Sequence, residues 1–372
     1  MTGWTRSVMG LAVSVMVGAT VAGAVLMTAP AERQGQAAER PPQAPLPETL
    51  LAARRLMVEW PTEDGLRTFP VAVWYPAARG PATQMVGDGP LLTGVAVQKD
   101  AVPQAPLGAR LPLVLLSHGS GGNMANQAWL ARDLVEAGYV VVSLTHPGST
   151  TGDSSARKAM ALWQRPGDLS AALETVLSDP QIAPLVDPAR IAAIGHSLGG
   201  YTVLAAGGAR LDRDAYRALC QRHPQQGDCA YFLSAGLSFD SLDRQRLEGS
   251  YRDPRIKAVV ALSPAFAQAF SADSLAAWPV PLLVVVLTGD ELLPHAANAA
   301  ALAARIPGAR LLEQPGGHFS VLPECKPGGK ALLAQEPDPS DRFLCDDAGQ
   351  DRAQVHQQVS TAVRAFLKDT GV

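Results

Sequence analysis

A serine with small neighbours stands near the middle of the chain, in the pentapeptide Gly195 to Gly199, whose pattern is G-x-S-x-G. The short apolar stretch Arg190 to Ile194 before it predicts a strand, and the run Leu198 to Ala206 after it predicts a helix. A serine at so sharp a strand-to-helix turn exposes its hydroxyl, and small flanking residues let the turn close. The pattern therefore predicts that Ser197 is a nucleophile, with the Leu198 amide placed to stabilise an oxyanion.

A serine hydroxyl is a weak nucleophile and needs a neighbouring base, usually a histidine that a carboxylate orients. Asp290 directly follows an apolar, strand-like run, and His318 lies in a glycine-rich turn after the last strand-like run. The order Ser, Asp, His, with the last two on loops after later strands, is one of the known triad orders. We expect Ser197, Asp290 and His318 to form a catalytic triad, with Glu291 as the alternative acid.

The other histidines fit the role of base less well. His356 falls on an amphipathic closing stretch and is expected at the surface, and His223 lies in a cysteine-containing insert. His295 comes too early in the chain to be the base, although it could line the site. His118 and His196 each adjoin a loop glycine, and we expect them to be hydrogen-bonded supports rather than proton carriers.

The second oxyanion donor should come from a different loop. The apolar run Leu111 to Ser117 predicts a buried strand, and the glycine-rich turn His118 to Asn123 follows it. Such a turn brings a backbone amide close to the substrate oxygen. We expect the amide of Ser120 to act together with that of Leu198.

These loops need a scaffold, and from residue 50 strand-like runs alternate with helical stretches. This alternation predicts an α/β fold with a mostly parallel central sheet of about eight strands flanked by helices. The expected strands are Leu56–Val58, Pro70–Tyr75, Leu111–Ser117, Tyr139–Leu144, Arg190–Ile194, Ile256–Leu262, Pro281–Leu287 and Arg310–Glu313. The expected helices are Asn126–Ala137, Asp168–Leu177, Leu198–Ala206, Asn298–Arg305 and Ala353–Lys368.

Two stretches interrupt the alternation. The glycine- and proline-rich segment Ala77 to Arg110 is expected to be a surface loop. Residues 208–254 form a polar insert that contains two cysteines. The insert is either a small cap over the site or a disulfide-pinned surface loop, and the sequence leaves both open.

Composition excludes several classes of function. The chain has 372 residues, 47% of them hydrophobic and 17% charged, which is ample for one large core. Its net charge of -3, without any basic run, gives no electrostatic basis for nucleic-acid binding. No phosphate-binding G-x-x-x-x-G-K pattern is present.

The first residues resemble an export signal. An uncharged apolar run from Val8 to Met27 follows Arg6, and Ala29 to Ala31 offers an A-x-A-like cleavage site. Residues 1–31 are therefore expected to be either a cleaved signal peptide or an uncleaved membrane anchor. The proline-rich residues 32–49 are expected to be a tether, which leaves residues 50–372 as a periplasmic or secreted catalytic domain.

The four cysteines agree with export, because disulfides persist in oxidising compartments. Cys220 lies near Cys229 and Cys325 near Cys345, so two local disulfides are the simplest pairing of the three that four cysteines allow. No C-x-x-C pair is present and no histidine stands at ligand spacing, so we expect no metal site.

Several motifs together resemble a known family. They are His118–Gly122, His146–Gly148, Arg165–Asp168, Gly195–Gly200 and Gly317–Phe319. Over residues 54–368 the chain resembles bacterial dienelactone hydrolase-like proteins, the platelet-activating-factor acetylhydrolase branch and, more distantly, cutinase-like polyester hydrolases. The resemblance implies an α/β-hydrolase fold and a cofactor-free serine hydrolase that acts on small-molecule or lipid-like carboxylic esters. It implies no partner protein.

The chain departs from these relatives at two positions. Dienelactone hydrolases use a cysteine nucleophile, where this chain has Ser197. The mammalian acetylhydrolases place their acid after an earlier strand, where this chain has Ser263. Neither dienelactone nor phospholipid specificity therefore carries over. Two other functions remain open: an amidase or peptidase on the same triad, and an exported, non-catalytic binding module with this fold.

Overall fold

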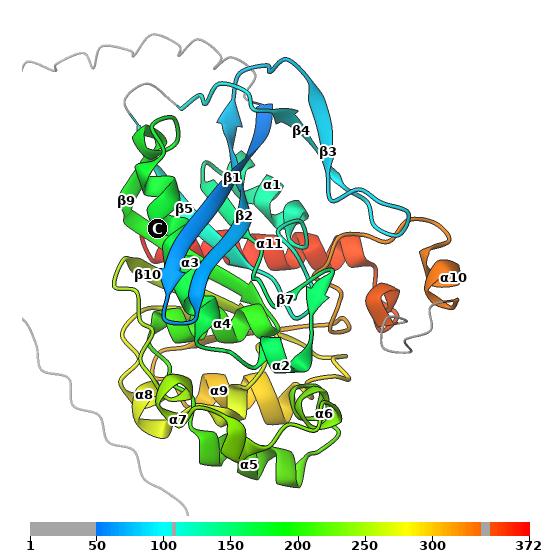
Figure 1. The fold of residues 1–372 in the computed structure, drawn as a ribbon. Helices are drawn as coiled ribbons and strands as arrows, with labels where there is room; N and C mark the ends of the chain where they lie inside the picture. The colour runs from blue at the N-terminus through cyan, green and yellow to red at the C-terminus, as the bar shows by residue number, and fades with distance from the viewer. Residues whose placement is uncertain (1–49, 106–108, 336–342) are drawn as a thin grey trace, which may run out of the picture. The chain divides into compact units, whose positions relative to one another are not determined.

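The computed structural model describes residues 50–105, 109–335 and 343–372, and a ten-stranded sheet runs through them (Figure 1). Its strands are β1 (Leu50–Thr62), β2 (Gly65–Ala77), β3 (Thr83–Val86), β4 (Val95–Lys99), β5 (Leu111–Ser117), β6 (Val140–Leu144), β9 (Val186–His196), β10 (Ile256–Leu262), β11 (Leu282–Leu287) and β12 (Arg310–Gln314). They lie in the order β12-β11-β10-β9-β5-β6-β2-β1-β4-β3. A separate short ladder pairs β7 (Ser149–Thr150) with β8 (Asp153–Ser154).

The neighbouring strands from β12 to β6 are all parallel, and they form the centre of the sheet. Every residue of β5, β6 and β11 is buried. Strands covered on both faces have near-continuous hydrophobic sequences, which is the pattern from which they were predicted. The antiparallel hairpin β1–β2 extends the sheet through an antiparallel pairing of β2 with β6.

Helices cover both faces of the sheet (Figure 1). The longer ones are α1 (Ala128–Glu136), α3 (Gln164–Ser178), α4 (Leu198–Gly207), α5 (Arg213–Arg222), α6 (Gly227–Ser234) and α11 (Arg352–Asp369). The shorter ones are α2 (Ala156–Ala159), α7 (Arg244–Leu247), α8 (Ala272–Ala276), α9 (Ala301–Ala304) and α10 (Gly329–Leu333). Successive side chains of β5 point to opposite faces of the sheet. Leu113 and Leu115 pack on the face covered by α3 and α4, and Val114 and Leu116 pack on the face covered by α1 and α11.

The parallel strands end at one edge of the sheet, and the loops that carry the predicted site residues follow them. His118 comes after β5, Ser197 after β9, Asp290 after β11 and His318 after β12. In open α/β sheets, ligands bind outside the carboxyl ends of the strands. The fold therefore gathers these loops where a substrate site is expected.

All eight strands expected from the sequence are present, and β3 and β4 are additional. Both come from the segment 77–110, for which the expectation of a surface loop was wrong in these two stretches. Val95 and Val97 alternate with more exposed neighbours and are buried where β4 pairs with the edge of the sheet at β1. The glycine and proline content of the segment concealed this short alternation.

Helix α3 begins at Gln164, four residues before the predicted start at Asp168. Pro166 is compatible with the first turn of a helix, because amides there have no intrahelical partner. As a result Arg165 and Asp168 lie on the same helix, three residues apart, and both are buried.

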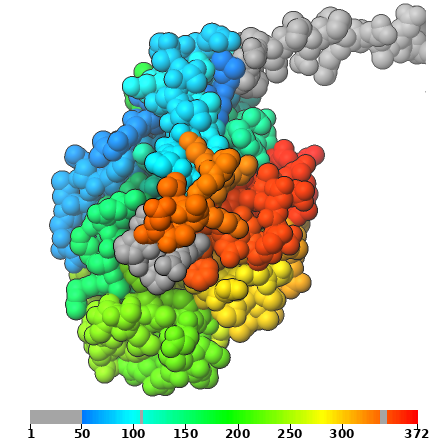
Figure 2. All heavy atoms as spheres, turned by 90° about the vertical axis from the view of Figure 1, so that its right-hand side faces the viewer, coloured from blue at the N-terminus to red at the C-terminus, as the bar shows by residue number. Residues whose placement is uncertain are grey.

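The four cysteines form the two local disulfides that were predicted. Cys220 is bonded to Cys229 within the insert, and Cys325 is bonded to Cys345 between β12 and α11. Figure 2 shows the insert in yellow-green at the lower part of one face, with the orange segment that follows His318 above it.

The expected leader (1–31) and tether (32–49) lie outside the described residues. Within the described part of the chain, none of the helices combines the length and apolarity needed to cross a membrane.

Candidate active site

Ser197 occupies a strained turn between β9 and α4. Its φ is 55° and its ψ is -118°, a backbone conformation that residues other than glycine rarely adopt. A Cβ atom on Gly195 would collide with the Gly199 carbonyl, and one on Gly199 would collide with the carbonyl of Ser117. The turn therefore requires both glycines of the pentapeptide, and it holds Ser197 at the carboxyl edge of the sheet.

Asp290 and His318 form a directed pair. The Nδ1 atom of His318 lies 2.6 Å from Asp290 Oδ2, and a carboxylate only accepts, so Nδ1 carries the proton. The other carboxylate oxygen accepts from the amides of Leu292 at 3.0 Å and Leu293 at 2.8 Å. Both members of the pair are buried. The carboxylate thus fixes the orientation of the ring and leaves Nε2 unprotonated, as a base requires.

Ser197 and His318 line one cavity of about 550 Å³. The structure has no hydrogen bond between the Ser197 hydroxyl and the His318 ring, a contact that is often long before substrate binds. Most of the cavity wall is apolar, and its large side chains include Met160, Leu162, Tyr231, Phe266, Phe319 and Leu322. The alternative acid, Glu291, is exposed and forms no hydrogen bond with His318. His295 is not among the residues that line this cavity.

The two predicted oxyanion donors line the same cavity as Ser197. Ser120 and Leu198 both line the cavity, and a Cβ placed on Gly119 would lie 3.2 Å from Ser197 Cβ. Leu198 is the first residue of α4, where amides are unpaired and the helix dipole favours negative charge. Neither amide donates to another group in the described residues. The arrangement leaves both N–H groups available to an oxygen in the cavity.

His118 and His196 are buried supports of these loops. His118 donates from Nδ1 to the Gly119 carbonyl at 2.6 Å, and its Nε2 accepts from the His146 amide at 3.1 Å. His196 donates from Nε2 to the His318 carbonyl at 2.9 Å. Burial lowers the pKa of both His118 and His196 well below the usual range, so both rings are neutral at neutral pH.

His356 was expected at the surface, and this was wrong. Its ring is buried, stacks on Trp129 at a centroid distance of 3.8 Å, and donates from Nε2 to the Leu322 carbonyl at 2.8 Å. The amphipathic pattern of α11 placed His356 among polar neighbours, but Trp129 on α1 covers that position. Leu322 lines the cavity, so His356 also supports its wall.

Helix α6 of the insert forms part of the cavity wall through residues that include Gly227, Asp228 and Tyr231. The Gly227 amide donates to the Leu292 carbonyl at 2.8 Å, and the Phe266 amide donates to Asp228 Oδ2 at 2.9 Å. Burial raises the pKa of the Asp228 carboxyl. The insert is therefore attached both to the loop that holds Asp290 and to the loop after β10.

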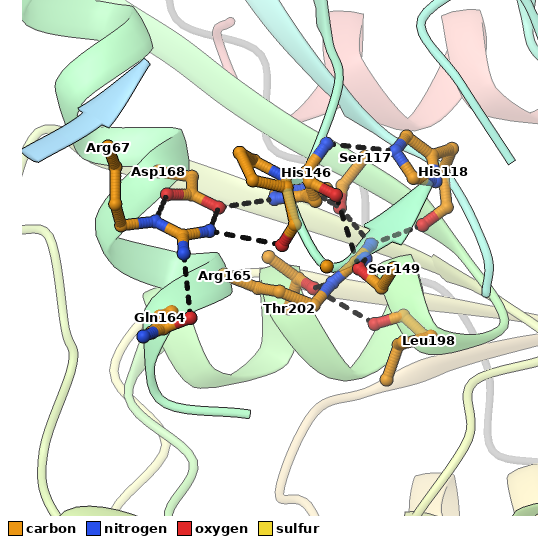
Figure 3. Close-up of polar contacts among 12 residues, drawn as sticks. Arg67, Ser117, His118, His146, Ser149, Gln164, Arg165, Asp168, Leu198 and Thr202 are labelled. Carbon is orange, nitrogen blue, oxygen red and sulfur yellow. Dashed lines mark hydrogen bonds and ion pairs between the residues drawn. The ribbon is translucent and has the colours of Figure 1, made fainter. Parts of the chain in front are cut away.

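A buried polar network, to which sequence analysis assigned no role, adjoins the turn after β5 (Figure 3). Arg67 donates two hydrogen bonds to Asp168, each 2.7 Å long, and His146 links Asp168 to Ser117. Arg165 contacts Ser117 from the other side. The motifs Arg165–Asp168 and His146–Gly148 were visible in the sequence, but these contacts between distant residues were not.

In the described part of the chain, no cluster of three or more His, Cys, Asp or Glu side chains has the geometry to hold a metal ion.

Comparison with known proteins agrees with the fold. A model of the Alpha/beta hydrolase family matches residues 113–326. Cutinase 2 of Thermobifida cellulosilytica is 32% identical over 113 residues, which cover 30% of this chain and 39% of that protein. A cutinase of Thermobifida fusca (strain YX) is also 32% identical over 113 residues, 30% of this chain and 32% of that protein. The match thus spans less than half the length of these curated relatives.

A solved structure resembles nearly the whole chain. The ferulic acid esterase from Streptomyces cinnamoneus superimposes with a TM-score of 0.54 at 20% identity, covering 88% of this chain and 92% of that one. At this identity the likeness concerns the fold.

Proposed function

The chain belongs to the alpha/beta hydrolase family, and on that premise we propose that it is a serine hydrolase that cleaves carboxylic esters through an acyl-enzyme intermediate. One observation carries the proposal: Ser197 and His318 line the same mostly apolar cavity, and Asp290 orients the His318 ring. The similarity to a ferulic acid esterase in fold, and to cutinases in part of the sequence, supports esters over amides as substrates. The finer assignment to the dienelactone hydrolase-like and acetylhydrolase-like branch rests on the sequence motifs alone.

In the proposed acylation step, Ser197 Oγ attacks the ester carbonyl while His318 Nε2 takes the hydroxyl proton. Asp290 holds the Nδ1 proton of His318 and stabilises the imidazolium that forms. The carbonyl oxygen becomes an oxyanion, which the amides of Ser120 and Leu198 stabilise. His318 then gives its proton to the departing alcohol oxygen, and the acyl group remains on Ser197.

Deacylation repeats these steps with water as the nucleophile. His318 takes a proton from the water that attacks the acyl-enzyme, and the same two amides stabilise the second oxyanion. Collapse of the intermediate returns the proton to Ser197 and releases the carboxylic acid. Losing one such donor costs about 2.7–4 kcal/mol of transition-state stabilisation in enzymes of this kind.

The place of action is also part of the proposal. Two disulfides fit an oxidising compartment, and the N-terminal apolar run fits an export signal or an anchor. We place the catalytic domain in the periplasm or outside the cell, free or tethered to the membrane.

The test is hydrolysis of p-nitrophenyl esters, from acetyl to palmitoyl, by the purified protein and its Ser197→Ala variant. We expect Ser197→Ala to reduce kcat by about 10⁶-fold, because the nucleophile is absent. The matched control is Ser241→Ala, which removes an exposed hydroxyl outside the cavity and should keep full activity.

Full activity in Ser197→Ala would refute the mechanism. Hydrolysis of p-nitroanilides in preference to esters would instead identify an amidase, and a folded protein inactive on both would identify a binding module.

A further inference from the structure

One buried guanidinium contacts both His118, at the start of the loop after β5, and Thr202 on α4 (Figure 3). Arg165, on α3, is 2% exposed and donates hydrogen bonds to four different residues. Nε donates to Thr202 Oγ1 at 2.8 Å and Nη1 to Ser149 Oγ at 2.6 Å. Nη2 donates to Ser117 Oγ at 3.3 Å and to the His118 carbonyl. No nitrogen of this side chain is left without an acceptor.

Two of these contacts lead to the amides that face the cavity. The His118 carbonyl is the start of the turn that carries the Ser120 amide. Thr202 lies on α4, and its hydroxyl donates to the Leu198 carbonyl at 2.9 Å while it accepts from Arg165. Arg165 therefore joins the loop after β5 to the first turn of the helix after Ser197.

A buried chain of side chains holds Arg165 in this orientation. His146 donates from Nδ1 to Asp168 Oδ2 at 3.1 Å, so its Nε2 accepts from the Ser117 hydroxyl at 2.9 Å. The oxygen of Ser117 is then oriented to accept from Arg165. Arg67 pairs with Asp168 at the far end of the chain.

This second Ser-His-Asp arrangement is closed to substrate, because Ser117, His146 and Asp168 are each 0% exposed. Burial lowers the pKa of the His146 ring well below its usual range, so the ring is neutral at neutral pH. Burial also lowers the pKa of Arg165 to about 9, which leaves the guanidinium charged at neutral pH. A cation buried at this depth is tolerated only with full hydrogen bonding, so its position is tightly determined.

We propose that Arg165 is a positioning residue for ester hydrolysis: through His118 and Thr202 it holds the Ser120 and Leu198 amides at the separation that an oxyanion requires. The inference rests on the proposed function. Donors act on the transition state only at about 2.7–3.1 Å from the oxyanion, so small displacements lower kcat while substrate binding in the apolar cavity persists.

The test removes one link of the network with the least change in shape. Thr202→Val replaces the hydroxyl with a methyl group and breaks both the bond from Arg165 and the bond to Leu198. Thr202→Ser keeps the hydroxyl and should restore the rate. The matched control is Thr175→Val on α3, which removes the same type of bond, from Thr175 Oγ1 to the Ala171 carbonyl, away from the cavity.

Two readouts are measured: kcat and KM for p-nitrophenyl esters, and the rate constant for labelling of Ser197 by an alkyl fluorophosphonate. In labelling, Ser197 Oγ bonds to phosphorus, fluoride leaves and the proton passes to His318, while the phosphoryl oxygen takes the oxyanion position. We expect Thr202→Val to lower both kcat and the labelling rate about 10- to 100-fold, with KM changed less than twofold. Arg165→Lys, which keeps a charge but cannot reach all four acceptors, should lose at least as much.

The outcomes separate this inference from the proposed function. If wild-type labelling and hydrolysis depend on Ser197 but Thr202→Val and Arg165→Lys behave like Thr175→Val, the positioning role is wrong and the esterase stands. A rise in KM with kcat unchanged would also overturn it, because that pattern reports on substrate binding. If the wild-type protein is not labelled at Ser197, the proposed function fails and the inference fails with it.

Discussion

Two neighbouring carboxylates, Asp290 and Glu291, show how surroundings separate residues that the sequence presents together. Asp290 is buried and accepts hydrogen bonds from the His318 ring and from two backbone amides. Glu291 is exposed. A buried carboxylate held by three donors has a defined direction, whereas an exposed one does not, so Asp290 is the residue able to orient the His318 ring.

Substituting the two carboxyl groups in turn tests this difference. In Asp290→Asn the amide group meets His318 Nδ1 as a donor, which moves the ring proton to Nε2 and prevents that atom from accepting. We expect kcat for p-nitrophenyl acetate to fall about 10⁴-fold with little change in KM. Glu291→Gln is the control and should remain within about threefold of the wild type; a larger loss there than in Asp290→Asn would reverse the assignment.

Local signals made the positions of Ser197, Asp290 and His318 after the carboxyl ends of strands predictable, because each follows a strand-like run and has small or polar neighbours. Their catalytic roles stay a prediction. The buried contacts of Arg165 and His356 could not be predicted from the sequence. Their contacts join distant parts of the chain: Arg165 to Thr202 spans 37 positions, and His356 to Leu322 spans 34. A single sequence shows which residues are polar, but it does not show which buried partners they will meet.

At the scale of elements, the parallel strands were predictable because burial on both faces makes a strand hydrophobic at every position. The edge strands β3 and β4 have no such signature, and Val95 and Val97 in β4 are their only buried residues. The role of α6 was likewise open, since a cap and a surface loop have similar compositions. In the structure α6 lies against the loops after β10 and β11 and lines the cavity.

Because a disulfide anchors α6 to α5, removing it should loosen one wall of the cavity. Cys220 and Cys229 lie 9 positions apart, and for a loop of this length the bond contributes about 2–3 kcal/mol to the free energy of unfolding. In the double variant Cys220→Ser/Cys229→Ser, urea denaturation should show the free energy of unfolding lowered by about 2–3 kcal/mol. We also expect KM for an octanoyl ester to rise about fivefold, which is equivalent to roughly 1 kcal/mol of binding free energy.

The acetyl ester is the internal control for this variant. Its short acyl group does not need the wall that α6 provides, so its KM should stay within twofold. Equal changes for the acetyl and octanoyl esters would show that α6 does not select for acyl length.

At the scale of the whole molecule, four buried histidines link folding to pH. Burial lowers the pKa of His118, His146 and His196 well below the ordinary value and that of His356 to about 4. The unfolded chain, in which histidine titrates near 6.5, therefore binds protons more readily than the folded one. The stability contribution is complete above about pH 6.5 and is lost as the pH falls through the folded pKa.

Stability should therefore decrease steadily between pH 6.5 and pH 4. His356 alone accounts for a loss of about 3 kcal/mol across that interval, from the difference between its two pKa values. Urea denaturation at a series of pH values measures how the free energy of unfolding changes with pH. His356→Phe keeps the stacking on Trp129 but cannot titrate, so its loss of stability between pH 6.5 and pH 4 should be smaller by about 3 kcal/mol. His223→Gln changes an exposed histidine and should leave the slope as it is; equal slopes in all three proteins would contradict this account.

The backbone of Ser197 has a consequence for how this protein can be altered. A residue with a side chain is held there at a φ of 55°, at a cost of order 1–3 kcal/mol that glycine would avoid. Laboratory selection for heat resistance alone will therefore favour glycine at position 197, at the expense of the hydroxyl. On the proposed function, engineering a more stable enzyme from this protein requires measuring turnover in every round, because the most stable backbone favours glycine at position 197 and the proposed chemistry needs serine.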